Sequence, residues 1–448
     1  MKYYLSGIAG TGMNVLAQYL IENGDLVFGS DRNFDRALDI EYKTFLESRK
    51  IIIVPQNGKI IDDSFDYCIF SAAVEKSVPD YQKAIAYKIP ILTRSQLLKN
   101  IFNKKNSIGI AGTSGKTTVT GMLATIYREL GVKFTLFCGA EILNYAENSL
   151  GGNFFYSDSE LLIAEVDESD RYINKYDADI GVVINISEDH MPLPELIPLF
   201  TEYIRKANVV IYNMDCPVLK KIVSKIEKPK ISFSLKDEKA DIFIEKIQLF
   251  SEGSSFTVKD TEFTLQVPGK YNIENAAAAI ATAYTKNISL TDISRTLFKF
   301  QGIKGRYEKI SDKNNRMIIY DFAHNPAKID SLLQTATLLN PVLIFFYQPH
   351  SYNAFRNQLD HLVQIFKKRI RPSDIVIIGK IYDAGGTVDR NISSSLLVNK
   401  LKKHPFQVFY AEDRKKAEKL IKNQMAAIST CFIVGARDRS LRNFARSL

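Results

Sequence analysis

The sequence predicts three α/β domains in series, each built on a largely parallel β-sheet. Three observations support this prediction. Short β-rich runs alternate with helical periods, the alternation restarts twice along the chain, and 448 residues are too many for one ordinary hydrophobic core. The predicted domains cover residues 1–101, 102–304 and 305–448.

The first predicted domain opens with the strand Tyr3–Ser6, the helix Met13–Glu22 and the strand Leu26–Gly29, and another strand follows at Tyr67–Phe70. This rhythm is typical of a parallel sheet. Glycines interrupt the apolar N-terminus and no small-residue cleavage site follows it, so we expect a strand of the mature fold, in a cytoplasmic protein, and no signal peptide. The polar stretch Asn103–Ser107 predicts the first boundary.

The remaining domains continue the same alternation. Residues 231–267 are expected to form short alternating strands, a helix is expected to start near Asn272, and residues 302–305 read as a flexible connector. Longer apolar runs predict the parallel strands. They are Ser107–Ala111, Leu161–Glu165, Ile180–Asn185 and Val209–Asn213 in the second domain, and Met317–Asp321, Val342–Tyr347, Ile375–Ile378, Val408–Tyr410 and Cys431–Val434 in the third.

Composition narrows the classes of partner. The net charge is +9, but lysines and arginines are spread along the whole chain and no nucleic-acid-reading motif accompanies them, so nucleic acid is not an expected partner. No run approaches the roughly 18–20 apolar residues of a membrane span. The cationic excess suits phosphate-rich small substrates or an ordinary solvated surface. Four widely spaced cysteines predict buried free thiols in a reducing compartment.

The strongest functional signal is the glycine loop at residues 109–118, GIAGTSGKTT, between a predicted strand and a predicted helix. Backbone N–H groups of such a loop surround phosphate oxygens, and the helix N-terminus adds partial positive charge. Lys116 is expected to reach the β- and γ-phosphates of ATP and Thr117 to bind Mg²⁺, although Ile110 replaces the first glycine of the usual pattern. The predicted phosphate contacts are Gly112, Thr113, Gly115, Lys116, Thr117 and Thr118.

A second glycine loop, Gly7-Ile-Ala-Gly10-Thr-Gly12, follows the first predicted strand. Its backbone allows the close approach that suits a diphosphate, and Asp31 after the next strand supplies a carboxylate where such folds commonly hold a ribose or a base edge. A purely structural turn is an alternative. An NAD-dependent oxidoreductase would use the same residues, but it leaves the loop at residues 109–118 unexplained.

Acidic residues and histidines follow several predicted strands. The run Glu165–Asp170 ends a strand downstream of the phosphate loop, and so many carboxylates require a cation, for which Mg²⁺ bound to ATP is the natural candidate. His190 ends the next strand and is expected to face the ligand crevice. In the third domain, His324 and His350 each follow a predicted strand in the same way.

Together these motifs resemble the Mur ligase family over essentially the whole chain and in the same order. GIAGTGM is similar to the family's UDP-binding loop, AGTSGKTT to its ATP loop, and AEVDESD and NISEDH to its metal-binding strands. VPGKYNIENAAAA, GIKGRYE, DFAHNP, YQPH and VGARD resemble its central helix, its hinge and its C-terminal motifs. The most similar branch adds L-alanine to UDP-N-acetylmuramate.

The resemblance implies a Rossmann-like N-terminal domain for the UDP-sugar, a central P-loop ATPase-like domain for ATP and a Rossmann-like C-terminal domain for the amino acid. It implies an ATP-dependent ligase of peptidoglycan synthesis, monomeric or weakly dimeric. This ligase joins the lactyl carboxylate of UDP-N-acetylmuramate to an amino acid through an acyl phosphate, with closure about residues 302–306.

The same resemblance implies roles for individual residues. The implied UDP-sugar contacts are Gly7, Gly10, Thr11, Gly12, Asp31 and Ser71, and the further ATP contacts are Asn272, Asn275, Arg306 and Asp321. The implied metal ligands are Thr117, Glu168 and His190, and the implied catalytic residues are Lys116, Glu168, His190, His324 and His350.

The chain departs from the alanine branch at four positions. Ser114 and Asn325 replace histidines, and Ser351 and Ala354 replace two arginines that are implied partners of the amino acid's carboxylate. A charged hydrogen bond of this kind is worth about 1.5–3 kcal/mol. Either the amino acid is not L-alanine or another arginine takes over the contact, the candidates being Arg356 and Arg437.

Two alternatives within the resemblance stay open. DFAH is also similar to the branch that attaches a recycled murein peptide to the same UDP-sugar, whereas Phe200 stands where other branches carry a modified lysine, which favours the alanine branch. The second alternative is a binding or regulatory protein built on a ligase scaffold that has lost its activity. The retained residues Lys116, Glu168, His190 and Arg306 argue against this alternative.

Overall fold

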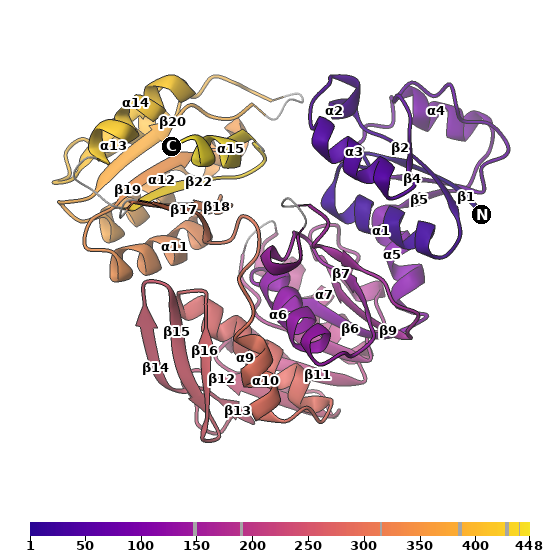
Figure 1. The fold of residues 1–448 in the computed structure, drawn as a ribbon, viewed down its shortest axis with the longest axis horizontal. Helices are drawn as coiled ribbons and strands as arrows, with labels where there is room; N and C mark the ends of the chain where they lie inside the picture. The colour runs from indigo at the N-terminus through magenta and orange to yellow at the C-terminus, as the bar shows by residue number, and fades with distance from the viewer. Residues whose placement is uncertain (147–149, 189–190, 314–315, 384–387, 426–429, 439) are drawn as a thin grey trace. The chain divides into compact units, whose positions relative to one another are not determined.

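The computed structural model describes residues 1–146, 150–188, 191–313, 316–383, 388–425, 430–438 and 440–448 (Figure 1). The chain folds into two compact units. The first contains residues 1–247, 255–265 and 272–301, and the second contains residues 248–254, 266–271 and 302–448. In the described part of the chain, no helix combines the length and the apolar character that a membrane span requires.

The N-terminal sheet has the strand order β3-β2-β1-β4-β5, and all its strands are parallel. Because β1 lies between β2 and β4, the strand order reverses at the carboxyl end of β1, which is where ligands bind in such sheets. Its strands are β1 (Lys2–Ser6), β2 (Leu26–Ser30), β3 (Ile52–Ile53), β4 (Tyr67–Phe70) and β5 (Ile91–Thr93), and its helices are α1 (Thr11–Glu22), α2 (Arg32–Asp35), α3 (Ile40–Ser48), α4 (Pro79–Ala86) and α5 (Arg94–Phe102).

The central sheet has the order β13-β12-β11-β10-β6-β9-β7-β8, and β7 and β8 are its antiparallel pair. Ile108 and Ala111 of β6, whose side chains point to opposite faces of the sheet, are both fully buried, as expected for a parallel strand covered by helices on both faces. The strands are β6 (Asn106–Ala111), β7 (Thr135–Phe137), β8 (Phe154–Phe155), β9 (Leu161–Glu165), β10 (Ile180–Val183), β11 (Val209–Asn213), β12 (Lys230–Ser234) and β13 (Ile242–Phe243). The helices are α6 (Lys116–Glu129), α7 (Leu193–Lys206), α8 (Pro217–Val223), α9 (Lys270–Thr285) and α10 (Leu290–Leu297), with short 3₁₀ turns at Leu143–Tyr145 and Ile173–Lys175.

Two further sheets complete the described structure. A small sheet has the order β14-β15-β16, and the C-terminal sheet has the order β17-β18-β22-β19-β20-β21, in which β17 and β18 are antiparallel and the other pairs parallel. The strands are β14 (Glu245–Phe250), β15 (Gly253–Val258), β16 (Thr261–Leu265), β17 (Glu308–Lys313), β18 (Arg316–Asp321), β19 (Ile344–Gln348), β20 (Ile375–Gly379), β21 (Gln407–Ala411) and β22 (Thr430–Gly435). The C-terminal helices are α11 (Pro326–Leu339), α12 (Tyr352–Arg369), α13 (Ser395–Leu401), α14 (Arg414–Gln424) and α15 (Ser440–Ser447).

The predicted fold class is confirmed, because three largely parallel sheets with flanking helices follow one another along the chain. Most predicted strands differ from the observed ones by one residue at one or both ends, and β10 and β19 differ by two residues at one end. β10 ends at Val183, shortly before Asn185 bonds to the phosphate loop, and β19 begins at Ile344, directly after Leu343, whose N–H donates to the Asp374 carboxylate at 3.1 Å. The domain boundaries at residues 101 and 304 stay predictions.

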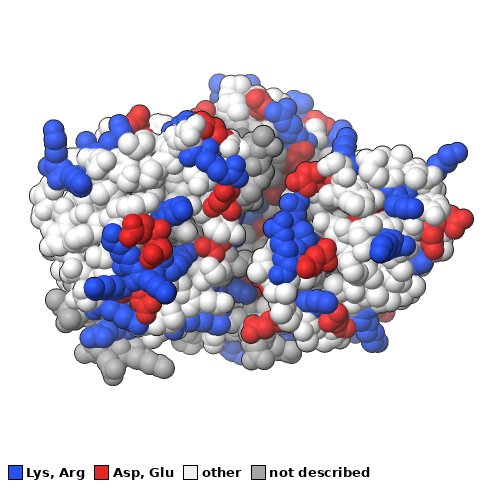
Figure 2. All heavy atoms as spheres, turned by 90° about the horizontal axis from the view of Figure 1, so that it is seen from above, with Lys and Arg blue, Asp and Glu red and all other residues white. Residues whose placement is uncertain are grey.

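The structure shows where the charged side chains and the four cysteines lie. On the face drawn in Figure 2, many lysine and arginine side chains lie beside aspartate and glutamate side chains. The four cysteines carry free thiols, and three of them are buried while Cys216 is half-buried.

Candidate nucleotide and ligase site

The loop at residues 112–115 connects the end of β6 to the start of α6, so its backbone lies at the positive end of a helix. Gly115 has a φ of +87°, which side-chain-bearing residues rarely adopt. A Cβ added there would lie 2.3 Å from Oδ1 of Asn275 on α9. Asn275 therefore packs directly against the loop, and its role as an ATP contact stays a prediction. Asn272 lies one turn earlier on α9, and Thr118 lies in the first turn of α6.

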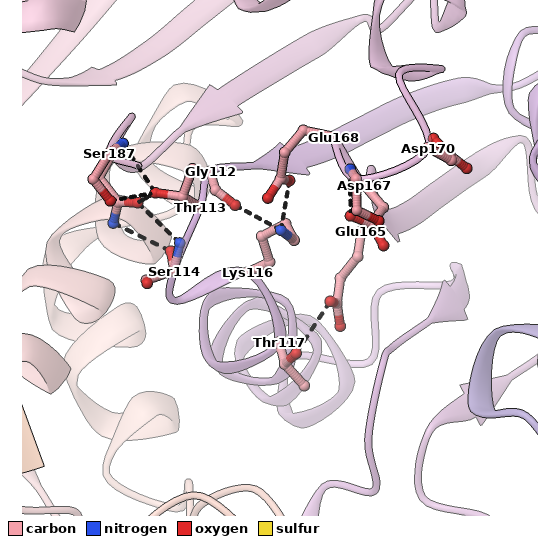
Figure 3. A network of polar contacts seen from close by, with 12 residues as sticks. Gly112, Thr113, Ser114, Lys116, Thr117, Glu165, Asp167, Glu168, Asp170 and Ser187 are labelled. Atoms are coloured by element: carbon pink, nitrogen blue, oxygen red, sulfur yellow. Dashed lines mark hydrogen bonds and ion pairs between the residues drawn. The ribbon is translucent and has the colours of Figure 1, made fainter. Parts of the chain in front are cut away.

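Lys116 is held between the loop and a buried carboxylate. Its Nζ lies 2.6 Å from the Gly112 carbonyl and 2.7 Å from Oε2 of Glu168 (Figure 3). Burial by itself would lower the pKa of Lys116, but the charges of Glu168 and Asp167 outweigh burial and raise it. Burial raises the pKa of Glu168 against the opposing effect of Lys116. The lysine therefore stays charged, and its ammonium group lies beside the Gly112 carbonyl of the loop.

Oxygen donors gather beside Lys116. The Thr117 hydroxyl donates to Oε2 of Glu165 at 3.1 Å (Figure 3). Glu165 also accepts from the N–H of Gly139. Hydroxyl and carboxylate oxygens are the donors that Mg²⁺ prefers, and Mg²⁺ usually takes one or two carboxylates together with substrate phosphates. Within the described ranges, no three His, Cys, Asp or Glu side chains form a complete metal cluster. The predicted ligand His190 lies outside the described residues.

Asn185, just beyond β10, fixes the shape of the phosphate loop. Its Oδ1 accepts from the Thr113 hydroxyl and from the N–H of Ser114, both at 2.9 Å, and its Nδ2 donates to the Ser114 carbonyl at 3.2 Å. The Ser187 hydroxyl lies 2.8 Å from that of Thr113 (Figure 3). The sequence prediction did not assign Asn185 to the site. Its position after the strand that neighbours β6 was the available signal, because parallel strands end at one sheet edge.

The N-terminal glycine loop joins the ends of three strands. The N–H of Gly7 donates to the Ser30 carbonyl at 2.8 Å, and the N–H of Ser71 donates to the Ser6 carbonyl at 3.1 Å. Asp31 accepts from the Ala9 N–H and caps α2 by accepting from the Asn33 N–H, both at 3.0 Å. The structure thus brings together the loop, Asp31 and Ser71. It also gives Asp31 a structural role that the sequence prediction missed. The remaining predicted residues, Gly10, Thr11 and Gly12, lie at the N-terminus of α1.

In the second unit, Asp321 organises the turn that follows residues 302–305. Its carboxylate accepts from the N–H groups of Tyr307 and Ala323, both at 2.7 Å. Burial raises the pKa of Asp321, and the charge of Arg306 opposes this rise. The Arg306 guanidinium lies over the Phe322 ring, 5.0 Å from its centroid. Arg306 and Asp321, both predicted ATP contacts, therefore lie in two neighbouring segments that the Asp321 carboxylate joins by hydrogen bonds.

His324 and His350 lie together at the carboxyl ends of β18 and β19. Their ring centroids are 5.0 Å apart and the rings are inclined at 73°. Nδ1 of His324 lies 2.9 Å from the Phe322 carbonyl, and because a carbonyl oxygen only accepts, this nitrogen carries the proton. The structure thus pairs the two histidines predicted to face the amino acid.

Residues that replace the expected histidine and arginine serve as helix caps. Asn325 caps α11 by accepting from the Lys328 N–H at 2.9 Å, and Ser351 caps α12 by accepting from the Ala354 N–H at 3.4 Å. Of the two candidate substitutes, Arg356 forms an ion pair with Asp389 at 2.8 Å, whereas Arg437 is exposed and has a φ of +67°.

A strand, a glycine loop and a helix that begins with a lysine paired to a buried glutamate define a nucleotide-phosphate-binding protein of the α/β class. Residues 2–106 match the model described as Mur ligase family, catalytic domain, and residues 110–283 match the Mur ligase middle domain. Relatives span nearly the whole chain, and the chain therefore belongs to the Mur ligase family, whose members depend on ATP.

Three relatives are UDP-N-acetylmuramate–L-alanine ligases. That of Rickettsia prowazekii is 31% identical, covering 91% of this chain and 84% of its own, and that of Dictyoglomus turgidum is 30% identical, covering 92% and 89%. That of Sulfurihydrogenibium sp. is 29% identical, covering 97% and 94%.

Solved structures share the fold. The UDP-N-acetylmuramate-alanine ligase MurC of Thermotoga maritima has a TM-score of 0.81 at 24% identity, covering 100% of this chain and 98% of its own. A murein peptide ligase of Psychrobacter arcticus has a TM-score of 0.70 at 20% identity, covering 100% and 99%.

Proposed function

We propose that this protein uses ATP to join L-alanine to the lactyl carboxylate of UDP-N-acetylmuramate, a step in peptidoglycan precursor synthesis. The observation that carries the proposal is the Lys116–Glu168 pair, which lies in a phosphate loop of a chain matched along nearly its whole length by ligases of that name. The use of ATP and the free thiols both suit a reducing compartment, so we place the enzyme in the cytoplasm. We further propose that it is a monomer or a weak homodimer, as the family resemblance implies.

In the first step, an oxygen of the lactyl carboxylate attacks the γ-phosphorus of ATP. The bond from that phosphorus to the β,γ-bridging oxygen breaks, so that ADP leaves and an acyl phosphate forms. Negative charge accumulates on the phosphoryl oxygens, and Lys116 together with the N-terminus of α6 stabilises it. Asn272, Asn275, Arg306 and Asp321 are the proposed further contacts to ATP.

In the second step, the amine of the amino acid attacks the carbonyl carbon of the acyl phosphate. The C–O bond to phosphate breaks, an amide forms, and the amine gives up a proton. We assign His324 and His350 to the region where this amine arrives, because their paired rings lie at the strand ends of the C-terminal sheet. Closure about residues 302–306 would exclude water, which otherwise hydrolyses the acyl phosphate.

The oxygen donors beside Lys116 fit Mg²⁺, and within the described ranges the predicted ligands Thr117 and Glu168 would hold it, together with Glu165, which bonds to Thr117. When bound, this ion neutralises phosphate charge during the transfer. The UDP-sugar is assigned to the N-terminal glycine loop, through Gly7, Gly10, Thr11, Gly12, Asp31 and Ser71.

A related activity, addition of a recycled murein peptide to the same UDP-sugar, is the second candidate. Ser351 and Ala354 favour it, because neither residue supplies a cation for the carboxylate of a free amino acid, and the Ser351 hydroxyl caps α12. A longer substrate would place its carboxylate elsewhere on the C-terminal sheet.

The test is to incubate the purified chain with UDP-N-acetylmuramate, ATP, Mg²⁺ and one of a panel of amino acids or a murein tripeptide. Phosphate release and the mass of the UDP-sugar product are measured. We expect release with L-alanine and a product heavier by one alanyl residue. Release with the tripeptide alone would favour the second candidate, and no release with any acceptor would reject both.

A further inference from the structure

Arg94 occupies a position that local structure disfavours. It is the first residue of α5, directly after the capping residue Thr93, and a helix N-terminus carries partial positive charge that repels a cation by about 0.3–1 kcal/mol. Helix α5 leads from the N-terminal sheet onto the central sheet, where its last residue, Phe102, packs against Tyr176 with ring centroids 5.2 Å apart. Tertiary contacts at this junction, and not helix formation, account for an arginine here.

One side of Arg94 lies against the N-terminal glycine loop. A Cβ added to Gly12 would fall 2.8 Å from Nη1 of Arg94 and 2.9 Å from its Cδ, so a side chain at position 12 would displace the arginine. The guanidinium therefore touches the loop that we assign to the diphosphate of the UDP-sugar. A cation beside such a loop senses any negative charge placed there.

The other side of Arg94 faces the acidic segment that follows β9. Nη2 lies 3.5 Å from Oδ2 of Asp170 and 3.9 Å from Oδ2 of Asp167, and the Ser95 hydroxyl also donates to Asp170. The Arg94 side chain is 27% exposed and that of Asp170 26% exposed, so water screens these contacts only in part.

The acidic segment connects Arg94 to the phosphate loop. Asp167 is adjacent in sequence to Glu168, which pairs with Lys116 (Figure 3). One short segment of carboxylates thus interacts with the cation of each loop.

We propose that Arg94 is a positioning residue that couples occupancy of the N-terminal glycine loop to occupancy of the phosphate loop. A diphosphate beside Gly12 competes with Asp167 and Asp170 for the Arg94 guanidinium. When Arg94 turns to the diphosphate, it neutralises these two carboxylates less, and the electrostatic potential at Lys116 and its ligand becomes more negative. Such coupling is reciprocal, so each nucleotide changes the affinity for the other by the same factor. This inference rests on the proposed function, which assigns the two loops to the two nucleotides.

The test measures the Kd of a non-hydrolysable ATP analogue with Mg²⁺ by calorimetry, without and with saturating UDP-N-acetylmuramate. We expect the two values to differ by about fivefold or more in the wild type. In Arg94→Met the ratio of the two Kd values is expected to approach one. In Arg94→Lys, which keeps the positive charge but loses the planar guanidinium, the ratio is expected to be intermediate. Asp170→Asn should also reduce the ratio, and combining it with Arg94→Met should add nothing further.

The matched control is Arg171→Met. It removes a positive charge from the same segment, but Arg171 is 66% exposed and pairs with Glu195, so the ratio should stay at the wild-type value. A purely structural role of Arg94 would change both Kd values and leave their ratio intact.

A wild-type ratio of one, or an unchanged ratio in Arg94→Met, overturns the inference while the proposed function stands. If the wild type neither binds UDP-N-acetylmuramate nor releases phosphate with any acceptor, the proposed function itself fails. Arg94→Lys and Asp170→Asn keep the test decisive if Arg94→Met does not fold.

Discussion

The ion pair between Arg442 and Glu308 offers a sharp test of how the C-terminal unit is stabilised. Nε of Arg442 on α15 lies 2.9 Å from Oε1 of Glu308 and 3.0 Å from its Oε2, and Nη2 also contacts Oε1. The two side chains are only 11% and 3% exposed. Oε2 of Glu308 also accepts from the N–H of Gly305 at 2.9 Å, so the pair ties the last helix to the turn that presents Arg306.

The perturbation is Arg442→Met, which keeps much of the aliphatic volume and removes the guanidinium. Glu308 then stays buried with the Gly305 N–H as its remaining described partner. Breaking a buried pair from one side costs about 3–5 kcal/mol, because a charge is left without compensation. Removing both charges in Glu308→Gln/Arg442→Met should recover most of that loss, since a neutral pair of similar volume is often nearly as stable.

The assay is urea denaturation in which hydrogen exchange of the amides in β18 and β22 is the readout. These amides report on the C-terminal unit alone, which is needed because a multidomain chain does not unfold in one step. Lys400→Met is the control. It breaks an ion pair whose side chains are 48% and 85% exposed, and such a change costs about 0–1 kcal/mol. If the double variant proves as unstable as Arg442→Met, the loss comes from the packing of Arg442 and the argument from an uncompensated charge is refuted.

Three further outcomes are expected. Lys116→Ala should lower kcat for phosphate release by about 10²–10³, and a rate within tenfold of wild type would contradict its role. Gly115→Ala should weaken the binding of an ATP analogue, measured by calorimetry. A φ of +87° costs alanine about 1–2 kcal/mol, and the new Cβ would collide with Asn275, so an unchanged Kd would argue against this reasoning. Burial raises the pKa of Asp321 above its ordinary value of 3.8, so its contribution to stability is complete below pH 3.8 and is lost as pH rises through the raised pKa. The urea midpoint of the C-terminal unit should fall over that window in the wild type and stay flatter in Asp321→Asn, and parallel profiles would count against the assignment.

The strands were largely predictable because buried parallel strands are continuous apolar runs bounded by polar residues. The predicted strands Tyr67–Phe70, Leu161–Glu165 and Val209–Asn213 coincide with β4, β9 and β11. The largest differences, of two residues, lie at the end of β10 and the start of β19, where hydrogen bonds link the chain to segments far away in the sequence. Asn185 reaches back to the phosphate loop, and Asp374 takes the N–H of Leu343.

The phosphate loop could be read from the chain alone, since its strand, glycines, lysine and helix are contiguous and their conformations are local. The partners of that loop could not. Glu168 meets Lys116 across 52 residues, Asn185 meets Ser114 across 71, and Arg94 meets Asp170 across 76. Which carboxylate neutralises which cation depends on distances of a few ångströms, because charge interactions fall off with separation and with access to water. Only the packing of the sheets sets those distances.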